Sequence, residues 1–276
     1  MKKNLLIAAL AIFGCATGFA QETETVTETL TPTADTYLRK GNEKDNGSKS
    51  VIEFHSTTDA DFVGLMSFSV PSKSGYDITK ATLVLYTQMV NGRETVSIYP
   101  FGNFNENDIY ENHESSIATA RAGQPIATGI TLSGWNGKAM KDVTAEQAEE
   151  YGTIDAWKTE IDLTSYIPTV GEGQVNLLLT NSDSRKTTIF TKDANDDDNE
   201  IKDIKNKGII NFEVNEVWPK LIVKYTTATG INEVETVEPV AKGKEGIYTL
   251  SGVRVAKADR PGIYIINGKK VMVGRK

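Results

Sequence analysis

The sequence is poor in cysteine, and this absence narrows the chemistry open to it. It contains one cysteine, Cys15, inside an N-terminal segment that has the features of a signal peptide. An exported chain whose only cysteine leaves with that segment has no disulfide, no thiol nucleophile and no thiolate metal site. Its stability therefore has to come from a hydrophobic core, and about 250 mature residues suffice for one large β domain and a small one.

Histidine is almost as scarce, and the usual catalytic motifs are missing. The two histidines, His55 and His113, have polar neighbours, and we expect both to be exposed loop residues. The chain has no Gly-x-Ser-x-Gly elbow, no His-Glu-x-x-His and no phosphate-binding loop. Its 37 acidic residues guarantee chance carboxylate pairs, and nothing marks one of them as a glycosidase pair. We therefore predict a protein that is not an enzyme, with a polysaccharide lyase or hydrolase as an alternative.

The first twenty residues predict export. Lys2 and Lys3 precede an apolar run over residues 5–14, which is too short to cross a bilayer but suits a signal peptide. Small residues, Gly18 and Ala20, stand at the −3 and −1 positions of a cleavage site before Gln21. The alternative is a lipoprotein in which Cys15 is lipidated. Either hypothesis places the protein outside the cytoplasm, on the outer-membrane surface or in the extracellular medium.

Charge is unevenly distributed along the chain. The total is −7, and residues 1–20 carry +2. Residues 231–276 contain nine Lys/Arg and five Asp/Glu, a net +4, which leaves −13 on residues 21–230. Because an acidic domain repels polyanions at long range, we expect no nucleic-acid partner.

Alternating apolar residues predict many short strands and little helix. The segments are rich in Val, Ile, Thr, Tyr and Phe, as half-buried strands require. The predicted strands are residues 25–31, 62–70, 81–87, 95–101, 174–180, 186–192, 208–214 and 220–226. One helix is predicted over residues 145–151, which follow Thr144 and precede Gly152. The pattern indicates an all-β protein, a two-sheet sandwich over residues 21–228.

Several motifs give this region a resemblance to a known family. They are "TPTADTYLRKGNEKDNGSKSVIEF", "GLMSFSVP", "ITKATLVLYT", "WKTEIDLTSYI", "TTIFTKDA" and "WPKLIVKY", in that order along residues 28–227. Together they resemble the DNRLRE-type domain, which is also classed among the carbohydrate-binding modules. The resemblance implies a jelly-roll β-sandwich that binds a polysaccharide or other glycan. The chain departs from the family where "FNEN" has Phe104 in place of Trp, and residues 107–156 are longer than the family pattern.

The C-terminal segment looks like a separate small β domain. Residues 229–245 are polar and charged and predict a linker. In residues 246–276, Asn267-Gly268 lies between two alternating apolar runs, which is the strongest short signal for a hairpin. This segment resembles the C-terminal domain read by bacterial type nine secretion, so the secretion machinery is an expected partner. The alternative is a minor β appendage of the sandwich.

Sugar recognition needs aromatic faces and charged or polar tips near them. In "DTYLRKG", Tyr37 and Arg39 share one side of a strand, with Lys40 on the other side. Lys192, at the end of a later strand, is expected to approach them, and Trp135 in a glycine-rich turn is a further candidate. Trp157 is expected in the core. The alternative is that Tyr37 is partly buried and that Arg39 pairs with one of the many acids.

The segment "FTKDANDDDNE", residues 190–200, is dense in oxygen ligands and raises the possibility of structural Ca²⁺. Asp193, Asn195 and Asp197 fit the first positions of an EF-hand loop, but Asp198 replaces its Gly and Ile204 its final Glu. The segment is therefore not an EF-hand, and the alternative to a calcium site is a solvated loop. No other cofactor is expected.

Taken together, these features predict an exported, non-catalytic carbohydrate-binding protein. The alternative of another class is a structural or adhesive surface protein. The oligomeric state does not follow from the sequence.

Overall fold

The computed structural model describes residues 24–57, 60–91, 95–182, 184–227, 246–250, 252–258, 260–267 and 269–274. The predicted signal peptide and the predicted linker lie outside these residues. Contacts divide the chain into two compact units, Met1–Ala228 and Thr229–Lys276. Within the described part of the chain, no helix is both long and apolar enough to span a bilayer.

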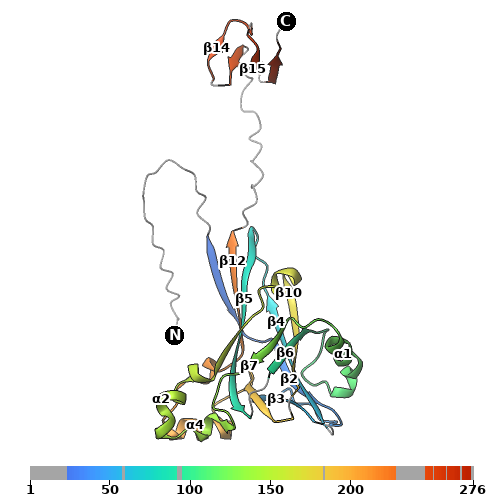
Figure 1. Cartoon of the computed structure of the whole chain (residues 1–276), viewed down its shortest axis with the longest axis vertical. Helices are drawn as coiled ribbons and strands as arrows, with labels where there is room; N and C mark the ends of the chain where they lie inside the picture. The colour runs from blue at the N-terminus through green and yellow to red at the C-terminus, as the bar shows by residue number, and fades with distance from the viewer. Residues whose placement is uncertain are drawn as a thin grey trace, which may run out of the picture. The chain divides into compact units, whose positions relative to one another are not determined.

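The first unit is a curled antiparallel sheet that folds into two layers (Figure 1). One layer contains β1 (Thr25–Leu30), β12 (Lys220–Thr227), β5 (Tyr76–Val90), β9 (Lys158–Asp162), β8 (Lys138–Ala139), β11 (Thr187–Phe190) and β3 (Val51–Ser56). The other contains β2 (Ala34–Arg39), β4 (Asp61–Val70), β10 (Gly173–Asn181), β6 (Thr95–Pro100) and β7 (Ala127–Thr131). Strand β3 joins the layers, because it pairs with β11 and, at its end, with β4. This confirms the predicted all-β sandwich.

Alternate side chains along each strand point inward and fill the space between the layers. Met66 and Phe68 of β4 and Leu83 and Leu85 of β5 are fully buried in one large cluster. Each strand turns its alternate side chains to the opposite face, so a second apolar set lies on the outside of each layer. Both outer sets need a cover, and short helices provide it.

Helix α1 (Tyr110–Ala122) covers the outer face of the β2–β4–β10 layer. Tyr110 and Ile117 of the helix are buried against Val63 and Leu65 of β4. This helix was not predicted, since its sequence "YENHESSIATARA" is polar except at these few positions. The helix has no continuous apolar stripe. It is held on the sheet by the packing of these few residues and by one ion pair, which is described below.

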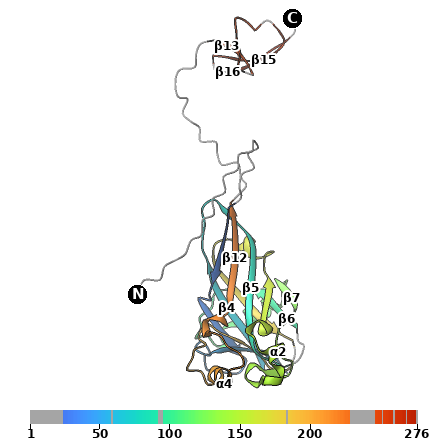
Figure 2. The same cartoon turned by 90° about the vertical axis from the view of Figure 1, so that its left-hand side faces the viewer.

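The other layer is covered by several short elements on the opposite side (Figures 1 and 2). They are α2 (Ala148–Tyr151), α4 (Asn199–Lys207) and the 3₁₀ helices Met140–Asp142, Ala145–Gln147, Ile154–Trp157 and Val214–Glu216. The short helix α3 (Ile167–Val170) is not part of this cover, because its Ile167 is buried in the central cluster between the layers. The predicted helix over residues 145–151 is confirmed as a 3₁₀ turn followed by α2. The predicted strand at 208–214 is wrong: Ile210 and Phe212 are buried side chains on irregular backbone, and Val214 begins a 3₁₀ helix.

Helix α4 forms where the sequence suggested a solvated loop. The Asp198 carboxylate accepts hydrogen bonds from the backbone N–H groups of Glu200, at 2.8 Å, and Ile201, at 3.2 Å, which caps the helix. Ile201 is buried, and Gly208 ends the helix with a φ of 65°. The acidic run therefore caps and begins a helix, where the sequence predicted a solvated loop.

The second unit contains a four-stranded antiparallel sheet. Its order is β14 (Arg254–Val255), β13 (Ile247–Thr249), β15 (Gly262–Ile266) and β16 (Lys269–Val273). Ile266 pairs with Lys269, and Asn267 has a φ of 50°, as the turn between two such strands requires. The predicted C-terminal hairpin is confirmed.

Candidate functional site

Two of the predicted ligand residues lie on one aromatic cluster. The rings of Tyr37 and Phe62 stack with 6.3 Å between centroids, and the guanidinium carbon of Arg39 lies 5.2 Å from the centre of the same Phe62 ring. His55 stacks on Phe62 as well, at 4.1 Å. Tyr37 is half-buried and Arg39 is exposed. We call these four residues the Phe62 cluster.

Lys40 points to the other side of β2, as alternation requires, and lines a groove beside α1. The groove has a volume of about 510 Å³. We call it the α1 groove; it is lined by Lys40, Gly41, Ser56, Thr57, Ala60, Asp61, Tyr110, Glu114, Ile117, Ala118 and Arg121. A second cavity of about 290 Å³ shares Ser56 and Arg121 with it. This side cavity adds Ser97, Tyr99, Thr180, Asn181 and Ser182.

Asp61 forms the polar centre of the α1 groove. Its carboxylate accepts hydrogen bonds from the Tyr110 hydroxyl at 2.7 Å and from both terminal nitrogens of Arg121, at 2.6 and 2.9 Å. Burial raises the pKa of Asp61, but the bonds from Arg121 and Tyr110 outweigh this and hold that pKa below its ordinary value. Because Asp61 begins β4 and both donors belong to α1, this bidentate pair fixes the helix on the sheet.

Replacing Asp61 should test that attachment. We expect Asp61→Asn to lower the free energy of unfolding by about 2 kcal/mol at pH 7, because Arg121 loses its charged partner. The folded-state pKa of Asp61 lies below the unfolded value, so this stabilisation is present above the unfolded pKa and is lost as pH falls through the folded one. The difference between the denaturant melts of the two proteins should therefore begin to shrink only as pH falls below about 4, the ordinary pKa of an aspartate.

A matched control is Glu114→Gln, which removes an ion pair on the same helix. Glu114 and Lys40 pair at 2.7 Å, and both side chains are 56% exposed. Such a surface pair adds little to stability, so this variant should melt like the wild type. Equal losses in the two variants would contradict the anchoring role of Asp61.

The rim pair of Lys40 and Glu114 leaves its charges available to a ligand. Because both groups are half in water, a hydroxyl or carboxylate of a bound molecule can replace either partner at small cost. The neighbouring Ser56 and Thr57 add hydroxyl groups to the same groove. Its chemistry is that of a polar surface with one ammonium, one guanidinium and two carboxylates.

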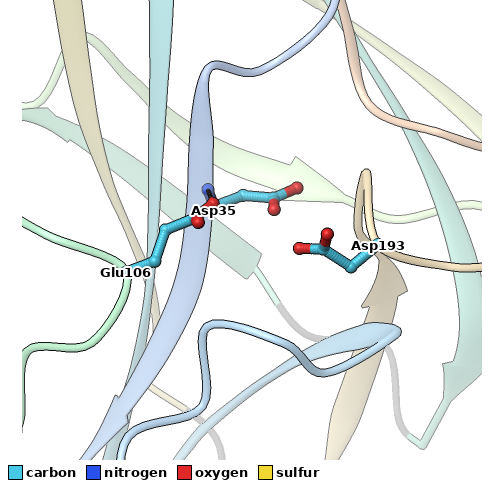
Figure 3. A group of neighbouring side chains, drawn as sticks. All are labelled: Asp35, Glu106 and Asp193. Atoms are coloured by element: carbon cyan, nitrogen blue, oxygen red, sulfur yellow. Dashed lines mark hydrogen bonds between the residues drawn. The ribbon is translucent and has the colours of Figure 1, made fainter.

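Within the described residues, the charged partners of Lys192 are acids, and it does not join the Phe62 cluster. Its ammonium is 2.6 Å from Glu106, 2.9 Å from Asp193 and 3.9 Å from Asp35. Figure 3 shows the carboxylates of Asp35 and Asp193 pointing toward each other, with Glu106 reaching Asp35 from the opposite side. One carboxylate oxygen from each acid lies within 4.8 Å of the others. We call Asp35, Glu106 and Asp193 the acidic triad.

Asp35 is the unusual member of the acidic triad. Its side chain is 0% exposed, and burial raises the pKa of Asp35 to about 7 despite the opposing effect of Lys192. The sequence alone does not reveal this group, because its members come from β2, from the loop before α1 and from the turn that follows β11. The family resemblance gave one signal for these three acids. Asp35 and Asp193 lie in the quoted family motifs, and Glu106 lies in "FNEN".

Of the predicted metal residues Asp193, Asn195 and Asp197, the structure gives the last two other partners. The Asn195 side chain donates to the Asp193 carbonyl and accepts from the Asp197 N–H, both at 2.9 Å, which forms a tight turn. Asp197 pairs with Lys202 at 3.3 Å and is almost fully exposed. Only Asp193 faces a set of converging carboxylates.

The remaining sequence predictions concern tryptophan and histidine. Trp157 is fully buried, as expected, and Trp135 stacks on Tyr151 with 5.5 Å between centroids, on the side of the sandwich opposite α1. The prediction that both histidines are exposed loop residues is wrong. His55 lies in β3 with a Glu53 partner at 3.1 Å, and His113 lies in α1 with Asp108 at 2.7 Å.

A comparison with protein families finds one match. The model of carbohydrate-binding module family 96 matches residues 26–124. This match supports a carbohydrate-binding module in that part of the chain. No curated protein matches the sequence.

Proposed function

We propose that the protein binds a polysaccharide in the α1 groove. One observation carries this proposal: every residue that lines the groove lies within residues 26–124, the range matched by the carbohydrate-binding module family. The groove is concave and polar, as a surface for hydroxyl-rich chains must be. Its attached side cavity extends the same surface over β6 and β10.

The groups along this surface suit a sugar chain. The hydroxyls of Ser56 and Thr57 and the charged ends of Lys40, Glu114 and Arg121 can hydrogen-bond to sugar hydroxyls. Tyr110 is buried, so its ring is not a stacking platform. Tyr99 in the side cavity is half-buried and supplies the aromatic face that a pyranose ring requires.

The Phe62 cluster is the alternative surface for the same function. Arg39 is exposed there and its planar fork suits a uronic-acid carboxylate, while Tyr37 gives an aromatic ring. The stacking of Tyr37 on Phe62 uses part of that ring for packing. The two surfaces therefore differ in charge: the α1 groove mixes both signs, and the Phe62 cluster offers a guanidinium.

The chemistry of the acids favours binding over catalysis. Asp35 has the raised pKa of a general acid, but it is fully buried and no polysaccharide chain reaches it. Asp61 is held ionised by Arg121, which is the wrong state for a proton donor. These two observations support a non-catalytic role for the sandwich.

The test is a pull-down of the full mature chain, residues 21–276, with a panel of soluble and insoluble polysaccharides. The proposal predicts retention on at least one polysaccharide and no release of reducing ends or unsaturated products from it. New products would support the lyase or hydrolase alternative. No retention on any glycan would favour the structural or adhesive alternative.

We also propose that the protein is exported and that residues 246–276 direct its last step. The support comes from the sequence: an apolar N-terminal run in residues 1–20 and a basic C-terminal segment that differs in charge from the sandwich. The first feature suits crossing of the inner membrane and the second suits sorting at the outer one. Lipidation of Cys15 is the alternative to soluble cleavage before Gln21.

Deleting residues 231–276 should separate sorting from folding. We expect the shortened protein to fold and to accumulate in the periplasm, because the sandwich keeps its own core. Fractionation with an antibody against the sandwich measures this. If the shortened protein reaches the surface or the medium at the normal level, the sorting role is wrong.

A further inference from the structure

The acidic triad brings together three carboxylates that are far apart in the sequence. Asp35 lies in β2, Glu106 in the loop between β6 and α1, and Asp193 directly after β11 (Figure 3). The backbone N–H of Asp35 donates to Glu106 at 3.0 Å, and the backbone N–H of Lys192 donates to Asp35 at 2.9 Å. The backbone thus holds the three acids in a fixed arrangement.

One carboxylate oxygen in this arrangement lacks a partner. Oδ2 of Asp35 accepts from the Lys192 N–H, but Oδ1, although fully buried, accepts no hydrogen bond from any residue that the structure describes. The Lys192 ammonium is 3.9 Å from Oδ1, which is too far for a hydrogen bond. Because an unpaired buried carboxylate oxygen is costly, the site lacks a positive charge close to Oδ1.

The charges and ligand atoms indicate which cation would fit. Three carboxylates and one ammonium leave a formal charge of −2, which a divalent ion would neutralise. The donors are all oxygens, which suits a hard cation and not zinc or copper. Ca²⁺ accepts mono- or bidentate carboxylates in irregular geometry, whereas Mg²⁺ requires a near-ideal octahedron.

We propose that Asp35, Glu106 and Asp193 form a calcium-binding site in which the Lys192 ammonium competes with the ion. The ammonium touches two of the three carboxylates, and its side chain is 21% exposed, so it can turn outward to water. Calcium then takes its place and reaches Oδ1 of Asp35. Water and backbone carbonyls complete the coordination shell.

The site has a structural consequence. It ties β2, which carries Tyr37, Arg39 and Lys40, to the loop that leads into α1 and to the turn before α4. Gly47 packs directly on Glu106, since a Cβ at this glycine would lie 2.6 Å from the Glu106 carbonyl oxygen. A bound ion would therefore fix four segments at one end of the sandwich. This inference does not depend on carbohydrate binding.

Calorimetry and thermal unfolding of the full mature chain test the site. The protein is treated with EDTA, dialysed, and titrated with calcium chloride, with magnesium chloride in parallel. We expect one calcium site and a rise of the melting temperature by roughly 5 °C at saturation, with a smaller response to magnesium. Absence of calcium binding by the wild type at millimolar concentration would overturn the proposal and leave Lys192 as the permanent counter-ion.

Two opposite variants separate a calcium site from a merely structural cluster. Lys192→Gln should bind calcium about tenfold more tightly, because the competing ammonium is gone, and should melt lower in EDTA. Asp35→Asn should lose the calcium response and yet melt no lower than wild type in EDTA, since it removes a buried charge. Asp193→Asn, at the more exposed edge, serves as the second ligand variant if Asp35→Asn does not fold.

Asp197→Asn is the matched control, because Asp197 belongs to the same acidic run but lies at the surface, where it pairs with Lys202. It should keep the wild-type calcium response. Loss of calcium binding in Asp197→Asn with retention in Asp193→Asn would place the ion elsewhere and overturn the assignment.

Discussion

A Trp157→Ala protein is expected to lose about 4 kcal/mol of unfolding free energy, which corresponds to a fall of roughly 10 °C in melting temperature. The Trp157 side chain is 0% exposed and meets Tyr151 edge-on at 6.3 Å. Its indole N–H donates to the Tyr151 carbonyl at 3.0 Å. The substitution therefore leaves a cavity and removes this hydrogen bond in the cluster under α2 and α4.

Gly134 shows how closely that ring is packed. A Cβ at Gly134 would lie 2.8 Å from the Trp157 ring, and the glycine has a φ of 138°, which side-chain-bearing residues rarely adopt. Neighbouring groups therefore cannot easily close the cavity left by Trp157→Ala. Denaturant melts followed by far-ultraviolet circular dichroism measure the loss.

Trp135→Ala is the matched control for this prediction. Trp135 is half-buried and stacks on the same Tyr151 ring, so its removal exposes less apolar surface. We expect it to cost about 1–2 kcal/mol. Equal losses in the two variants, or a larger loss in Trp135→Ala, would contradict the placement of Trp157 at the centre of this cluster.

The second large effect concerns carbohydrate binding. Tyr99→Leu keeps apolar volume but removes the aromatic face, and Lys40→Ala removes the ammonium at the rim of the α1 groove. We expect each change to weaken binding about tenfold, and the double variant about a hundredfold, because the two groups lie in adjoining cavities and act separately. Isothermal titration with the polysaccharide found in the panel measures the affinities.

Tyr37→Ala and Arg39→Ala are the comparison set, since they change the Phe62 cluster and leave the α1 groove intact. If the groove is the binding surface, Arg39→Ala should bind like the wild type. If Arg39→Ala instead loses about 1.5–3 kcal/mol of binding, the ligand is acidic and lies on the Phe62 cluster. A fall in melting temperature of Tyr37→Ala would show that this ring serves the core.

Salt separates neutral from acidic ligands at either surface. Binding of a neutral chain should barely respond to ionic strength, whereas binding of an acidic chain through Lys40 or Arg39 should weaken as salt is added. The titrations are therefore run at low and high sodium chloride. The slope identifies the charge of the ligand independently of the mutations.

The sequence predicted the parts of the fold that depend on local pattern. Strand alternation placed Met66 and Phe68 together on one side of β4, and both are core residues. The Asn267-Gly268 signal predicted the C-terminal hairpin because turn geometry is set by two residues. Trp157 was expected in the core because it precedes the "DLT" segment of a quoted family motif, and its side chain is buried.

The parts that the sequence did not predict depend on distant contacts. Helix α1 has a polar sequence, and its position follows from Tyr110, Ile117 and the Arg121–Asp61 pair, whose partners are 60 residues apart. The acidic triad joins Asp35 to Glu106 across 71 residues, so no spacing rule finds it. Each of these groups can be recognised only when the packing of the two layers is known.

The acidic run at residues 193–200 shows the same limit in one short segment. Asp193 faces the triad, Asp198 caps α4, and Asp196 and Asp197 pair with lysines of that helix. The sequence shows only a dense row of oxygen ligands. Side-chain direction, which separates these roles, is fixed by the turn that Asn195 closes.

The most direct test of the carbohydrate-binding surface is a map of amide chemical shifts during titration of the ¹⁵N-labelled mature chain with an oligosaccharide of the bound polysaccharide. The account predicts that the largest shifts fall on Lys40, Gly41, Ser56 and Thr57 and along the exposed side of α1, with smaller ones around Tyr99. Shifts confined to the surroundings of Trp135, to residues 246–276, or to no residue at all would contradict it.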